Sequence, residues 1–166
     1  PVKNIPDVVR VFALTRKNVN CRLLMVGDGP ELPAARSLAQ QLGVAEDVLF
    51  LGRQTAVEEF MACADLFLLP SAFESFGLSA LEAMSCGLPV IATDAGGLPE
   101  VVAPGVDGWL CRVGDCECMA KRATELLQDD DKRRAMGQAA RTKAVERFSP
   151  ERIVPQYEEV YKLALG

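Results

Sequence analysis

Two glutamates, Glu74 and Glu82, flank the stretch of the chain whose residues are best suited to bind a ligand. Glu82 lies in an otherwise apolar helical stretch, where an ionised carboxylate costs free energy unless it has a partner. A pair of ribose hydroxyls fits that requirement, because a carboxylate can accept a hydrogen bond from each. A Glu82 that faces solvent or pairs with an arginine is the plainer alternative. Glu74 precedes the helix and is expected to face the same cleft.

The residues between these glutamates predict an anion site. Pro70 ends a strand, a polar loop follows, and a helix is expected from about position 76. The N–H groups at a helix start have no partner within the helix, and they carry the positive end of its dipole. A diphosphate is therefore expected against the amides of Ser75, Phe76, Gly77 and Leu78. Gly77 is interpreted as the position where a side chain would hold the phosphate away.

These residues are positioned by an alternation of short apolar strands and helices. Gly96-Gly97 opens a short turn or helix over 98–102, and Thr55 with Glu58 predicts a capping box. Strands are expected over 21–26, 48–51, 66–69, 89–92 and 108–111, and helices over 7–17, 31–42, 55–63, 76–85, 116–127, 130–147 and 149–166. Strands separated by helices pair in parallel through right-handed crossovers. The predicted fold is a single α/β domain, with a doubly wound, Rossmann-like parallel sheet and helices on both faces.

Ligands of such a sheet bind beyond the carboxyl ends of its strands. The loop from Gly27 through Gly29 to Pro30 lies at one of these ends, but it matches a dinucleotide fingerprint poorly. Leu32 stands where the third glycine belongs, and no acidic residue ends the next strand. An NAD enzyme is therefore not expected. Gly27 and Gly29 serve either as a tight turn or as a wall for a ligand, with Pro30 near the first position of the next helix.

Composition narrows the class of protein. A formal net charge of −5 argues against nucleic acid as a partner, and no apolar run is long enough for a membrane span. The 166 residues include six cysteines and no histidine, and the cluster Cys111, Cys116 and Cys118 has no matching second pair. A metal site is therefore not expected. The cysteines are interpreted as reduced thiols of a cytoplasmic protein.

The segment Glu74-Ser75-Phe76-Gly77-Leu78-Ser79-Ala80-Leu81-Glu82 resembles the E-x7-E signature of the retaining glycosyltransferases of family 4. These enzymes have the two-domain GT-B fold, of which this chain would be the C-terminal, donor-binding half. The similarity continues in order along the chain, over 26–30, 48–52, 64–71, 82–90, 96–100 and 105–108.

The resemblance implies a role for each matching residue. Glu74 is expected to hold the transferred sugar, and Glu82 the ribose hydroxyls. The amides of 75–78 would hold the distal phosphate, and the backbone at Arg53 and Gln54 would meet the base. Lys3 matches a lysine on the diphosphate that offsets leaving-group charge. The expected reaction retains anomeric configuration by front-side attack, without a metal or other cofactor.

The sequence also departs from the family. The resemblance implies an earlier strand and an N-terminal acceptor domain, and both are absent here. Within the family, residues 24–31 and the stretch through 114–115 are similar to a bacterial subgroup that transfers N-acetylglucosamine from UDP-N-acetylglucosamine (UDP-GlcNAc) to malate. Two alternatives stay open: a donor-binding module without chemistry of its own, and half of a nucleotide-sugar epimerase.

Overall fold

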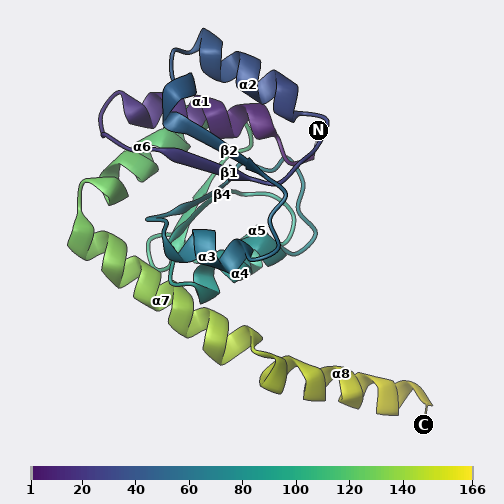
Figure 1. Cartoon of the computed structure of the whole chain (residues 1–166). Coiled ribbons are helices and arrows are strands. Elements are labelled where there is room, and N and C mark those ends of the chain that lie inside the picture. Colours follow the sequence, from purple (N-terminus) through teal and green to yellow (C-terminus); the bar gives the residue numbers. More distant parts are fainter. Residues whose placement is uncertain (1, 166) are drawn as a thin grey trace.

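A computed structural model describes residues 2–165. Parallel strands form its middle layer (Figure 1). The strands are β1 (Leu23–Val26), β2 (Val48–Gly52), β3 (Phe67–Leu69), β4 (Val90–Thr93) and β5 (Gly108–Cys111). Helices α1 (Ile5–Arg16), α2 (Leu32–Gln41) and α6 (Cys116–Leu127) cover one face. Helices α3 (Val57–Ala62), α4 (Leu78–Ser85), α5 (Leu98–Val101) and α7 (Asp130–Phe148) cover the other, and a short 3₁₀ helix, η1 (Ala45–Asp47), precedes β2.

The strands form two parallel sheets. β1 pairs with β2, and β4 pairs with β3 on one side and with β5 on the other. The predicted α/β class, the parallel pairing and the helices on both faces are confirmed. The structure differs from one continuous sheet in that β1 and β3 are not hydrogen-bonded to each other within residues 2–165.

The strands of the two sheets differ in how deeply they are buried in the hydrophobic core. In β4, Val90 and Ala92 pack with α4 and α5, while Ile91 packs on the opposite face with α1 and α6. β4 is thus buried on both faces, as expected of a central parallel strand. In β1 only Leu23 and Met25 are buried, while Leu24 keeps 38% of its surface exposed. The uniform burial expected from the apolar strands therefore holds at β4 but not at β1.

Two local predictions at helix starts are wrong. α3 begins at Val57 with Ala56 at its N-cap and no side-chain cap, so Thr55 and Glu58 form no capping box. α2 begins at Leu32, so the proline of its first turn is Pro33 rather than Pro30. Both helices begin later than the sequence pattern indicates, because the loops after β1 and β2 extend further than the polar residues alone suggest.

The prediction that all cysteines are free thiols is wrong for one pair. Cys111, the last residue of β5, forms a disulfide with Cys118 in the first turn of α6. The Asp115 carboxylate accepts the backbone N–H of Cys118 at 2.9 Å and so caps the start of α6. Cys116 stays free, and burial, assisted by the neighbouring Asp7 carboxylate, raises the pKa of its thiol to about 11.

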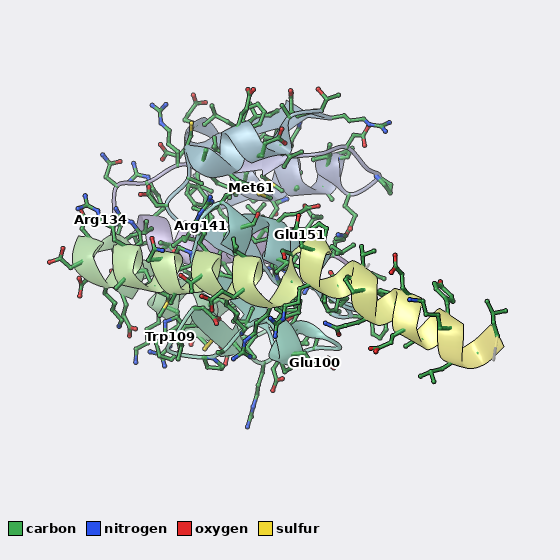
Figure 2. All side chains as sticks on the ribbon, turned by 90° about the horizontal axis from the view of Figure 1, so that it is seen from below. Met61, Glu100, Trp109, Arg134, Arg141 and Glu151 are labelled. Carbon is green, nitrogen blue, oxygen red and sulfur yellow. A yellow bond between two sulfur atoms is a disulfide. The ribbon has the colours of Figure 1, made fainter. Side chains whose placement is uncertain are left out.

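Helix α8 (Pro150–Leu165) extends beyond the layered part of the domain. It continues from the end of α7, and Glu151 marks its start in Figure 2. Its side chains are mostly exposed, including Tyr157 and Tyr161. None of the helices described over 2–165 is long and apolar enough to cross a membrane.

Gly137 lets α7 approach the end of α4. A Cβ atom at this position would lie 2.2 Å from the carbonyl oxygen of Gly87. Alanine is favoured over glycine in a helix by about 1 kcal/mol, but overpacking a close contact costs about 1–3 kcal/mol. We expect Gly137→Ala to lower the free energy of unfolding in urea despite its better helix propensity. Ala135→Gly, at an exposed position of the same helix, is the control, and it should cost only the propensity difference. A stabilised Gly137→Ala variant would contradict this packing.

Candidate functional site

The loop after β3 leads into α4, and both expected carboxylates belong to this segment. α4 begins at Leu78, with Gly77 as its N-cap in a left-handed conformation (φ 99°). The expected start near Phe76 is therefore two residues early, and the amides of Ser75 and Phe76 belong to the preceding loop. The unpaired N–H groups of the first helical turn begin at Leu78, because the first bond within the helix runs from the Leu81 N–H to the Gly77 carbonyl.

The structure explains the glycine at position 77 differently from the expectation that a side chain there would hold a phosphate away. Gly77 is buried, and a Cβ atom there would lie 2.8 Å from Cδ2 of Leu98. Its positive φ is also a conformation that residues with a side chain adopt only at a cost. Glycine is therefore favoured by the backbone turn, and an added Cβ would also have to displace the Leu98 side chain of α5, on the side that faces the core.

Backbone packing against a second loop fixes the position of Glu74. The Glu74 carbonyl accepts the Gly97 N–H at 2.9 Å. A Cβ atom at Gly96 would lie 1.8 Å from the same carbonyl oxygen, and one at Gly97 would lie 2.5 Å from the Ser75 carbonyl oxygen. The adjacent glycines thus let two backbone segments touch, and this contact holds Glu74 at the carboxyl end of β3.

A cavity of about 970 Å³ lies between β1 and β3, and we refer to it as the central groove. Where the two strands end, its wall includes Lys3, Gly27, Gly29, Ser79 and Glu82. The structure therefore brings the predicted residues Lys3, Gly27, Gly29 and Glu82 to one mouth of one groove, although they come from three separate parts of the chain.

The other predicted residues lie outside the groove wall. Leu78 is 64% exposed beside the mouth, and the Phe76 ring packs edge-on against Phe148 at a centroid distance of 5.8 Å. Beyond β2, Arg53 is exposed, and the Gln54 side-chain amide donates to the Leu51 carbonyl at 2.7 Å. The Gly27 N–H donates to the Gly52 carbonyl at 2.7 Å, so the loop that carries Arg53 and Gln54 is tied to the Gly27 turn.

The charged groups of the site are available to a ligand. Glu82 is exposed, as the plainer of the two interpretations given above has it. Over residues 2–165, the side chains of Lys3, Glu74 and Glu82 take part in no hydrogen bond or ion pair. Lys3 and Glu82 are exposed and Glu74 is half-buried, and no protein partner has to be displaced before their side chains bind a ligand. The same residues contain no group of three or more cysteine, aspartate or glutamate side chains that could hold a metal ion.

Sequence reasoning missed two contributors. Gly96 was expected only to open a turn, yet its contact with the Glu74 carbonyl is the tightest of these approaches. The signal was the pair of adjacent glycines facing a polar loop. Ser79 lies in the first turn of α4 and lines the groove, while its hydroxyl is buried without a hydrogen-bond partner. Its place between the two glutamates gave no distinct signal.

A helix start, a lysine and free carboxylates thus gather at the strand ends of a parallel α/β domain, the edge at which sheets of this class bind their ligands. The family model described as "Glycosyl transferases group 1" matches residues 1–143. The chain therefore belongs to the group 1 glycosyltransferases.

Curated relatives agree with this family. The chain is 48% identical over 160 residues to N-acetyl-alpha-D-glucosaminyl L-malate synthase of Bacillus anthracis, covering 96% of this chain and 42% of that enzyme. It is 41% identical over 140 residues to D-inositol 3-phosphate glycosyltransferase of Corynebacterium urealyticum, covering 82% of this chain and 32% of that enzyme. The chain thus spans less than half the length of these relatives.

Solved structures show the same fold. Sucrose-phosphate synthase from Thermosynechococcus elongatus superimposes with a TM-score of 0.91 at 29% identity, over 99% of this chain and 43% of that one. HepE from Anabaena, in complex with UDP and glucose, superimposes with a TM-score of 0.89 at 30% identity, over 98% and 45%.

The close approach of Gly96 to the Glu74 carbonyl can be tested by substituting Gly96. Gly96→Ala adds a clash to the strain of a positive φ (57°), so it should lower the free energy of unfolding by about 2–4 kcal/mol. Gly114→Ala is the matched control, because Gly114 also has a positive φ (81°) but nothing within 4 Å of an added Cβ. It should cost only the strain, about 1–2 kcal/mol. Equal losses for the two variants in urea denaturation would rule out the close loop contact.

Proposed function

We propose that this domain binds UDP-GlcNAc as the donor for glycosyl transfer with retention of configuration, without a metal ion. The observation that carries this proposal is the 48% identity over 160 residues to an enzyme named for N-acetylglucosaminyl transfer to malate. Complexes of the Anabaena relative with UDP, and with UDP-glucose at 30% identity and a TM-score of 0.87, support a uridine nucleotide.

In this proposal the nucleotide lies across the groove mouth. Glu82 accepts hydrogen bonds from the two ribose hydroxyls, and the backbone at Arg53 and Gln54 meets the uracil. The diphosphate lies between the Gly27–Gly29 turn and the first turn of α4, whose unpaired amides and dipole favour an anion. The exposed, unpaired state of Glu82 supports this role, because no protein contact competes with the ribose.

In the proposed transfer step the protein orients the reactants and stabilises charge. The bond between the anomeric carbon and the phosphate oxygen breaks, UDP leaves with the electron pair, and the acceptor hydroxyl attacks from the side that UDP vacates. The acceptor proton passes to the departing phosphate oxygen. Lys3 and the α4 amides stabilise the charge that develops on the phosphate. Glu74, held through its backbone by Gly97, orients the sugar hydroxyls.

The acceptor, for which malate is our first candidate, is proposed to bind another part of a longer enzyme. The support is that this chain corresponds to only 42% of the length of the Bacillus anthracis enzyme. Binding of the donor and transfer of the sugar are therefore tested in different proteins: the chain itself, and a chimera in which it replaces the matching 160 residues of that enzyme.

Glu82→Ala should weaken UDP binding to the chain by about 1.5–3 kcal/mol, the range for hydrogen bonds to a charged group. Isothermal titration calorimetry measures this as a loss of affinity of roughly 10- to 150-fold. Glu117→Ala, at an exposed position on α6, is the control and should leave the affinity unchanged. Equal affinity for UDP in the Glu82 variant would remove the ribose role.

Glu74→Gln should separate transfer from binding. In the chimera we expect kcat for UDP release to fall about a hundredfold, because misplacing a reactant by about 1 Å has an effect of that order. UDP affinity measured by calorimetry on the isolated chain should change less than twofold, since Glu74 is assigned to the sugar and not to the nucleotide. Unchanged turnover would exclude Glu74 from the site, and a lost UDP affinity would reassign it to the nucleotide.

A further inference from the structure

A disulfide joins the outermost strand of the three-stranded sheet to the helix that follows it. Cys111 is the last residue of β5 and Cys118 lies in the first turn of α6, with their Cα atoms 6.1 Å apart. Within residues 2–165, β5 pairs with β4 alone, apart from an isolated bridge at its first residue, Gly108. The end of such a strand opens locally with little cost, because backbone hydrogen bonds hold it on one side only. The disulfide therefore secures a strand end that the sheet itself holds on one side.

The same strand end holds the loop after β4. The carbonyl of Cys111 accepts the Asp94 N–H at 2.7 Å. Asp94 begins the loop that leads to Gly96 and Gly97, and the Gly97 N–H donates to the Glu74 carbonyl at 2.9 Å. A series of backbone contacts thus runs from the disulfide through Asp94 and Gly97 to Glu74, across the ends of three neighbouring strands.

The two cysteines of the disulfide differ in exposure. Cys111 keeps only 4% of its surface exposed, whereas Cys118 is half-buried and follows the exposed loop 112–115. A thiol from solution therefore reaches Cys118 first. Attack by a thiolate on an accessible sulfur is the step by which disulfides open and form again.

Cys116 lies between these cysteines in the sequence, but it does not compete for the bond. All three belong to one hydrophobic cluster, and burial, assisted by the Asp7 carboxylate, raises the pKa of the Cys116 thiol to about 11. Only a thiolate attacks a disulfide, and a thiol with this pKa stays protonated at neutral pH. Cys116 therefore takes no part in the exchange.

We propose that the Cys111–Cys118 disulfide is a reversible redox site for low-molecular-weight thiols, and that its opening loosens the loop that holds Glu74. A first thiolate attacks the Cys118 sulfur, the bond to Cys111 breaks, and the Cys111 thiolate takes a proton. A second thiolate attacks the sulfur of the first small molecule and releases Cys118 as a thiolate, which also takes a proton. The protein gains two electrons and two protons, and the two small thiols leave as one disulfide. The reverse steps close the bond again.

Opening the bond separates the end of β5 from α6. The Asp94 N–H then exchanges its partner for water more often, and the loop at Gly96 and Gly97 is held by fewer contacts. Glu74 is placed less precisely, because Gly97 holds it through the backbone. This last step rests on the proposed function, in which Glu74 orients the transferred sugar, whereas the redox site and the loosening of the loop do not.

Thiol titration tests whether the bond exchanges in the folded protein. The chain is incubated with reduced glutathione without denaturant, freed of glutathione, and then unfolded for titration. We expect four thiols in the closed form and all six cysteines after the reaction. Cys116→Ala should react with glutathione at the same rate. A folded chain that keeps its disulfide under these conditions would overturn the proposal, and so would a Cys116→Ala variant that no longer reacts.

Amide hydrogen exchange measures the effect on the loop, with Cys118→Ala as a permanently open form. We expect opening to speed exchange at Asp94 and Gly97 about tenfold more than at Gly27, whose N–H donates to Gly52 in the other sheet. Cys63→Ala, at an exposed free thiol, is the control and should change none of these rates. An equal change at all three amides would mean that the bond stabilises only the fold as a whole, which would overturn the loosening of the loop.

Calorimetry with UDP-GlcNAc and with UDP separates this inference from the proposed function. In the open forms we expect the affinity for UDP-GlcNAc relative to UDP to fall about fivefold, because part of the hydrogen bonding to the sugar is lost. A loosened loop with an unchanged ratio would overturn the link to Glu74. If neither ligand bound any form of the chain, the proposed function would fail while the redox site stood.

Discussion

The contact between two backbone segments, Glu74–Gly77 and Gly96–Gly97, is the constraint on which the site depends. Its hydrogen bond joins the Gly97 N–H to the Glu74 carbonyl, and no Cβ atom fits at either glycine. The contact ties the loop after β3 to the loop after β4. It therefore fixes the direction in which α4 leaves the sheet, and with it the places of Glu74 before the helix and of Glu82 within it.

The second constraint is the division of the strands. β3, β4 and β5 form a sheet with a core on both faces, whereas β1 and β2 form a separate ribbon packed mainly on α1 and α2. The groove between them holds Lys3, Gly27, Gly29 and Glu82 at one end. The site is therefore assembled from residues of both sheets, at the polar end of a groove whose other walls are mostly apolar.

Much of this arrangement was predictable from the sequence. The alternation of strands and helices predicts the α/β class, and glycines, which tolerate the positive φ found at Gly43 and Gly87, mark the ends of α2 and α4. The sequence left the exposure of Glu82 open between two interpretations, and it did not predict the reason for Gly77, which depends on a contact with the separate helix α5. The Cys111–Cys118 disulfide was also missed, because it depends on how the short loop between β5 and α6 turns. Leu98 meets Gly77 only after α5 has packed, and the open groove beside α4 leaves Glu82 in solvent instead of an apolar core.

The roles assigned to Glu82 and α4 are tested most directly by a crystal structure of the chain with UDP. In that structure we expect both ribose hydroxyls to donate to the Glu82 carboxylate. We also expect the diphosphate to lie between the Gly27–Gly29 turn and the first turn of α4. UDP bound away from the groove mouth, or a ribose held by other side chains while Glu82 remains in solvent, would contradict it.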